Sequence, residues 1–172
     1  DSLGEGFFAT RRLMLSLNYT YTQSKIKADK TLVPSPIQNG SGTPVMLPAN
    51  LIFRDGAPLT GQSDHLVNFQ FGIEDTESLS QLTLLVNYAS ERVTNRGPNL
   101  LPDIIEKPGF RLDLVARQGV QLAGGEFELK FEARNLTGTK YNEYQDFGDH
   151  GLVYINRYRL GRVFSIGASA KF

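Results

Sequence analysis

The stretch FELKFEAR, residues 127–134, decides the fold class, because apolar residues alternate strictly with charged ones. A period of two is typical of a β-strand with one apolar and one polar face. Helical periodicity is scarce elsewhere, whereas the same alternation recurs in five more segments. The six predicted strands are 13–22, 66–74, 82–91, 110–117, 127–134 and 164–172. The sequence therefore predicts an all-β, antiparallel, up-and-down fold.

The strands and their connections favour a membrane. The predicted strands are longer than the ~5–6 residues usual in soluble proteins, and a tilted strand crosses a bilayer with ~9–11 residues. Two connections are short (75–79 and 122–125), and three are long and rich in Pro, Gly, Asn, Asp and Ser (27–63, 93–109 and 142–157). Outer-membrane barrels have short periplasmic turns and long extracellular loops. We therefore predict that the short turns are periplasmic.

The tyrosines agree with this orientation. Tyr is amphipathic and collects at the interface between bilayer and water. All seven fall toward or beyond the strand ends that the orientation makes extracellular: Tyr19, Tyr21, Tyr88, Tyr141, Tyr144, Tyr154 and Tyr158. Tyr is also a favoured strand residue in general, but that preference predicts Tyr at both ends.

Composition excludes several classes of function. The formal net charge is zero, which gives no reason to expect a nucleic-acid partner, and there is no Cys for disulfides, thiolate nucleophiles or metal ligation. His65 has no positioned Ser or Cys partner, so we expect no enzyme activity and no cofactor. Asp146, Asp149 and His150 share one loop and are conceivable metal ligands, but such residues are ordinary in loops, and we expect no metal.

Charged residues occupy the polar side of two neighbouring predicted strands: Arg111, Asp113, Arg117, Glu128, Lys130, Glu132 and Arg134. They form either a lumen-facing polar wall that contacts a plug or a solute, or a ladder of cross-strand ion pairs; we favour the ladder, at roughly 0.2–1 kcal/mol a pair. A turn at Ala123-Gly124 sets Asp113 opposite Arg134, whereas a turn at Gly124-Gly125 sets Arg117 opposite Glu132. The sequence leaves both turns open.

Three arginines, Arg157, Arg159 and Arg162, lie near the rim that we assign to the outside. Guanidinium groups bind phosphates well. A contact with anionic ligands or with lipopolysaccharide is therefore one interpretation, and ordinary solvated charges are the default.

The last eight residues, SIGASAKF (165–172), resemble the C-terminal signal that the outer-membrane assembly machinery reads. That signal has a polar residue, a glycine, an apolar residue and a final aromatic. Ser165, Gly167, Ala170 and Phe172 occupy these positions, with Ala170 a small choice for the apolar one. The resemblance implies a last strand that pairs and enters lipid during assembly.

Four stretches resemble the last strands of TonB-dependent outer-membrane receptors: 59–75, 111–122, 130–144 and 161–172. Asn135-Leu136-Thr137 before Tyr141 matches the family's NLT…Y, and Gly161-Arg162 before Phe164 matches its GR.F. The resemblance implies a bacterial outer-membrane location and a 22-stranded barrel with an N-terminal plug. It also implies energised import, through TonB, of a scarce ligand such as a siderophore, cobalamin or saccharide.

The chain departs from that plan, since it has no plug, no TonB-contact box and too few strands. We therefore expect residues 1–172 to be the C-terminal segment of such a barrel, with lipid, lipopolysaccharide, the assembly machinery and an unknown small ligand as partners. A fragment of a passive porin or of a small anchoring barrel is the first alternative. A soluble β-barrel that binds a ligand is the second, because period two does not say which face meets water.

Overall fold

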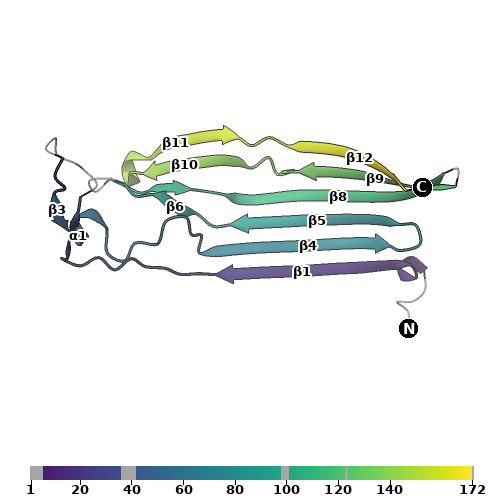
Figure 1. Ribbon diagram of the computed structural model, residues 1–172, viewed down its shortest axis with the longest axis horizontal. Helices are drawn as coiled ribbons and strands as arrows, with labels where there is room; N and C mark the ends of the chain where they lie inside the picture. The colour runs from purple at the N-terminus through teal and green to yellow at the C-terminus, as the bar shows by residue number, and fades with distance from the viewer. Residues whose placement is uncertain (1–5, 36–41, 98–100, 123, 172) are drawn as a thin grey trace.

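The computed structural model describes residues 6–35, 42–97, 101–122 and 124–171. Nearly all regular structure in these residues is antiparallel β-sheet, as the sequence predicts (Figure 1). The largest sheet has six strands in the order β1-β4-β5-β8-β9-β12. Their bounds are β1 Arg11–Tyr21, β4 His65–Asp75, β5 Ser80–Ala89, β8 Gly109–Leu122, β9 Gly125–Arg134 and β12 Val163–Lys171. Each of the six predicted segments is thus found as a strand of this sheet.

Six strands is nevertheless too few, because the described residues contain twelve. A second sheet, in the order β11-β10-β7-β6, consists of β6 Arg92–Asn95, β7 Ile104–Glu106, β10 Lys140–Asp146 and β11 Leu152–Arg159. A small third sheet pairs β2 Leu32–Pro34 with β3 Met46–Pro48. The short helical turns are η1 Gly6–Phe8, α1 Ala49–Ile52 and η3 Gly148–His150. The long connections expected to be loops therefore carry strands of their own.

The second sheet extends the first at the end where the long connections lie, and β11 runs on into β12 along the same edge (Figure 1). Two register shifts interrupt this sheet: β11 has one extra residue, Ile155, opposite Glu143 and Tyr144 of β10, and β6 has one extra residue, Thr94, opposite β7. Such β-bulges place two residues opposite one and interrupt the alternation. A sequence scan for period two therefore misses these strands.

The six-stranded sheet is open. Within the described residues, β1 pairs only with β4 and β12 only with β9, so both are edge strands and no closed barrel is found.

One face of this sheet is apolar across all six strands. Cross-strand partners share a face, and one row of Cα partners crosses the whole sheet: Leu13, Ile73, Leu82, Ala116, Phe131 and Ile166. This face is open, with Ile166 at 84% exposure and Leu15 at 70%. The buried apolar residues of the described part are only Ala57, Val93, Ala133 and Tyr144. The sheet therefore has no hydrophobic core of its own.

Asn135 ties the two sheets together where β9 ends. Its backbone is left-handed, with a φ of 54°, a conformation that Asn tolerates better than most residues. The buried side-chain amide donates to the carbonyls of Thr139 and Gly161, at 3.1 and 2.6 Å, and its oxygen accepts from the Thr139 N–H at 3.0 Å. The NLT segment is thus a hydrogen-bonded junction between neighbouring strands.

Candidate functional site

The opposite face of the six-stranded sheet is polar, and it carries the predicted charged residues. Val115 lies opposite Glu132, Arg117 opposite Lys130 and Gly119 opposite Glu128. Alternation along each strand puts the remaining members on the same side. The structure therefore brings all seven onto one face, from two adjacent strands: Arg111, Asp113, Arg117, Glu128, Lys130, Glu132 and Arg134.

The register decides between the two turns. The last partners of β8 and β9 are Leu122 and Gly125, and Gly124 has a φ of 82°. This register corresponds to the turn at Ala123-Gly124, although Ala123 itself lies outside the described residues. The alternative turn at Gly124-Gly125 is wrong, because Arg117 lies opposite Lys130 and not opposite Glu132.

The ion pairs on this face run along one strand and not between strands. Glu132 binds both Lys130 and Arg134, each two residues away on β9, with a separation of 3.0 Å to Arg134 Nη2. Asp113, which the register places level with Arg134, accepts a hydrogen bond from the Asn135 backbone N–H at 2.7 Å. The expected cross-strand ladder is therefore wrong within the described residues, since the Asp113 carboxylate holds the junction instead.

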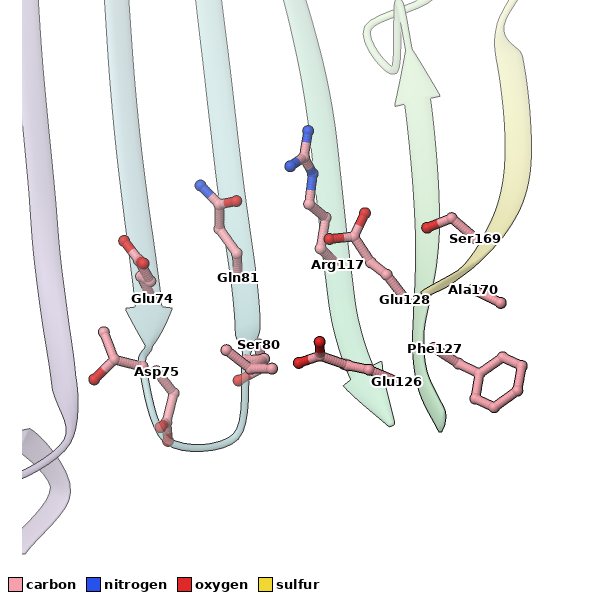
Figure 2. A pocket seen from close by; sticks show the side chains of 13 residues that line it. Glu74, Asp75, Ser80, Gln81, Arg117, Glu126, Phe127, Glu128, Ser169 and Ala170 are labelled. Atoms are coloured by element: carbon pink, nitrogen blue, oxygen red, sulfur yellow. The ribbon is translucent and has the colours of Figure 1, made fainter. Parts of the chain in front are cut away.

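A hollow of about 480 Å³ opens at the short-turn end of the sheet. Figure 2 shows Glu74, Gln81, Arg117 and Glu128 side by side there, from four different strands. Asp75, at the adjoining turn, accepts the backbone N–H groups of Glu77 and Ser78, both at 3.1 Å, and pairs with Arg11 at 3.4 Å. The hollow thus mixes carboxylates with one guanidinium.

The residues of the assembly-signal resemblance divide between the two faces of β12. Ser165 and Gly167 lie opposite Glu132 and Lys130 on the polar face, and Ala170 lies opposite Phe127 on the apolar one. A methyl group added at Gly167 would meet no atom within 4 Å, so packing does not demand a glycine there. Phe172, the last residue of the signal, lies outside the described residues.

Sequence reasoning missed a buried polar cluster in the second sheet. Glu106 and Glu143 are Cα partners on β7 and β10, and each is only 7% exposed. Arg92 Nη2 lies 2.7 Å from Glu106, and Asn156 donates to Glu143 at 2.7 Å. Burial of two carboxylates requires such partners. To predict this cluster one must know which strands pair, and the pattern of a single sequence does not show that.

The cluster shifts two pKa values. The hydrogen bond from Asn156 lowers the pKa of the Glu143 carboxyl, although burial opposes this. Burial, with a further contribution from a hydrogen bond to Glu143, raises the pKa of the Tyr141 hydroxyl to about 12. At neutral pH the cluster therefore holds an ionised Glu143 beside a neutral Tyr141.

The remaining candidates have structural partners. His65 Nδ1 lies 2.9 Å from the Tyr19 hydroxyl, in a group of aromatic rings that includes Tyr21. Asp146 accepts the backbone N–H of Gly148 at 2.8 Å. Over the ranges that the structure describes, no three His, Asp or Glu side chains are grouped as metal ligands.

The three arginines that the sequence analysis assigns to a rim, Arg157, Arg159 and Arg162, do not form one cluster with a common contact. The Arg157 guanidinium lies over the Tyr154 ring, 4.6 Å from its centroid, and Arg159 lies opposite Lys140. Arg162 Nε donates to the Leu136 carbonyl at 3.0 Å, so its role here is to hold the junction around Asn135.

No helix among the described residues is long and apolar enough to cross a membrane. Comparison of the chain with models of protein families, with curated proteins and with solved structures gave no match.

Proposed function

We propose that this chain is the C-terminal part of the barrel wall of a TonB-dependent outer-membrane receptor, which imports a scarce ligand by energised transport. One observation carries the proposal: an unbroken, exposed apolar face runs across six paired strands that have no core. Monomeric soluble proteins rarely expose an apolar patch of that extent. A bilayer covers such a face without any further protein.

Strand dimensions support the same proposal. The six strands have 9 to 14 residues, and ~9–11 tilted residues cross the hydrocarbon layer. The connections 76–79 and 123–124 are short and lie at one end, whereas the second sheet lies at the other. In the proposed orientation the short turns are periplasmic and the second sheet stands outside the membrane.

The tyrosines fit that orientation. Tyr19, Tyr21 and Tyr88 lie on the apolar face near the end toward the second sheet, and the other four belong to β10 and β11. An aromatic girdle at the outer membrane surface has this placement.

In such a barrel the polar face would line the lumen, and the edge strands β1 and β12 would each pair with a further strand. Even small single-chain barrels use at least about 8 strands. Further strands of a longer protein would therefore close the barrel, and a plug and TonB would act through parts outside this chain. We propose transport and not catalysis as the role of the whole.

A passive porin is the second candidate, because its wall would have the same two faces. Uptake measured in cells that carry the longer protein separates the two. Uptake that stops when TonB is depleted supports the receptor, whereas unchanged uptake supports the porin.

The membrane part of the proposal is tested by refolding residues 1–172 with and without detergent micelles. We expect β-structure, measured by circular dichroism, that depends on the micelles, and association in their absence because both edges and the apolar face are open. A monodisperse, cooperatively folded monomer without detergent, measured by analytical ultracentrifugation, would contradict the membrane assignment and favour a soluble β-protein.

A further inference from the structure

The half of the polar face on β1, β4 and β5 carries few charges. On β1, β4 and β5 the polar side has only two charged residues, Arg12 and Glu74, which are Cα partners near the short-turn end. This half also carries three large apolar residues, Met14, Leu66 and Leu85. Its amides and hydroxyls include Ser16, Asn18, Thr20, Asn68, Gln70 and Asn87. The seven predicted charges all lie on the other side of the face, on β8 and β9.

Three of the amides form a straight row. Asn18 is the Cα partner of Asn68, and Asn68 is the Cα partner of Asn87. Neighbouring strands lie about 4.8 Å apart, so equivalent amides recur at that interval across three strands. Arg111 on β8 continues the same row and ends it with a cation.

The amides of this row are free to bind a ligand. Asn68 and Asn87 are exposed, and neither side chain forms a hydrogen bond with another described residue. Asn18 has only a 3.5 Å contact from the Thr20 hydroxyl. By contrast, the amides of Asn135 and Asn156 are engaged by the protein itself. The side chains of the row therefore do not stabilise the sheet through hydrogen bonds of the kind that Asn135 and Asn156 form.

The chemistry of the row selects a class of ligand. A side-chain amide offers two donors and an acceptor, and a hydroxyl group offers one donor and two acceptors, so the two groups complement each other. An anionic ligand would call for a cluster of cations, which these three strands do not supply. An uncharged ligand with many hydroxyl groups matches the donors and acceptors of the row and the scarcity of charge around it.

We propose that the row Asn18, Asn68 and Asn87 binds a neutral carbohydrate chain, laid across β1, β4 and β5. The location of this ligand in a lumen rests on the proposed function, because only that function makes the polar face an inner wall. The amide row supplies hydrogen bonds, and Arg111 supplies a charged donor at one end.

Saturation-transfer NMR on the full chain folded in detergent tests this proposal, with neutral glucans, xylans and mannans as probes. We expect binding by at least one neutral probe at millimolar concentration. Replacing two amides together, Asn68→Ala with Asn87→Ala, should weaken it roughly tenfold or more, since each net hydrogen bond contributes on the order of 0.5–1.5 kcal/mol and about 1.4 kcal/mol is tenfold. Gln121→Ala is the matched control, an exposed amide on the charged half of the same face, and should leave binding unchanged.

Two results would overturn the proposal. One is that no neutral probe binds the folded chain. The other is that a sulfated form of the same glucan binds more tightly than the neutral form, with a loss on replacing Lys130 and not on replacing Asn68 and Asn87. The refolding experiment tests the membrane proposal independently of the amide site. A chain that folds only without detergent and still binds the probe through the amides would contradict the membrane proposal and support the amide site.

Discussion

The two main sheets differ in which side chains they expose and which they bury, although both are antiparallel. In the six-stranded sheet a whole face of apolar side chains stays exposed, with Leu15 and Leu17 at 70% and 67%. In the second sheet, charged groups are buried, and Glu106 and Glu143 are nearly inaccessible. The first sheet needs an apolar partner from outside, whereas the second satisfies its polar groups internally. One chain therefore combines an exposed apolar face with a sheet that buries paired polar groups.

The largest expected effect tests the proposal that the apolar face of the first sheet meets lipid. Leu84 is on the apolar face and its neighbour Leu85 is on the polar face, opposite Asp113. An arginine at the bilayer midplane costs roughly 2–4 kcal/mol, so Leu84→Arg should lower the free energy of unfolding in lipid vesicles by about that amount. Leu85→Arg is the matched control and should cost less than about 1 kcal/mol. Equal costs, or a larger cost at Leu85, would show that the apolar face does not contact lipid.

The next effect tests the buried cluster of the second sheet. Arg92→Ala leaves Glu106 buried beside Glu143 without its cation. Losing one partner of a buried pair costs about 3–5 kcal/mol, and we expect about 2–3 kcal/mol because the Arg92 side chain is 34% exposed. Hydrogen exchange of the β6 and β7 amides measures this local stability.

Lys107→Ala is the control for that experiment. Its pair with Glu91 is exposed, at 63% and 46% for the two side chains. Exposed pairs contribute about 0–1 kcal/mol. If Lys107→Ala accelerates exchange as much as Arg92→Ala does, burial is not what gives the Arg92 pair its strength.

A smaller effect tests the junction between the sheets. Asn135→Gly keeps the left-handed backbone accessible but removes the amide hydrogen bonds to Thr139 and Gly161. We expect a loss of roughly 1–2 kcal/mol in thermal unfolding, from about two net hydrogen bonds. Asn135→Ala should lose more, because alanine also disfavours a φ of 54°. Similar losses for both variants would mean that the backbone conformation is not strained.

The smallest effect is a pH dependence of the second sheet. Because the pKa of Glu143 is lowered in the folded state, its stabilisation is present above its unfolded pKa and is lost as the pH falls through the folded value. Because the pKa of Tyr141 is raised to about 12, its stabilisation is complete below the unfolded pKa near 10 and is lost between about 10 and 12. Hydrogen exchange of the β10 amides should become faster as the pH falls through the folded pKa of Glu143. An identical acid response in Glu143→Gln would exclude Glu143 as the cause.

The contrast between the sheets also explains what the sequence could predict. Strict alternation in 127–134 and in the other five predicted segments identifies each strand and its two faces. A shift of one residue would move every side chain to the opposite face, so the pattern fixes the faces firmly. Register was beyond reach, because Gly124 and Gly125 allow two turns, and the amide row depends entirely on register. The second sheet is hard to predict because bulges interrupt β6 and β11, and because β7 has only 3 residues. Its buried Glu106 and Glu143 are also residues that are ordinary in loops.

The chain contains no Trp and no Cys, so single tryptophans placed along β1 report depth in a bilayer without background. The most direct test of the central claim is quenching of their fluorescence by lipids brominated in the acyl chain, for Leu13→Trp, Met14→Trp, Leu15→Trp and Ser16→Trp in vesicles. We expect strong quenching at positions 13 and 15 and weak quenching at 14 and 16. Uniform quenching, or the reverse alternation, would contradict an apolar face that meets lipid.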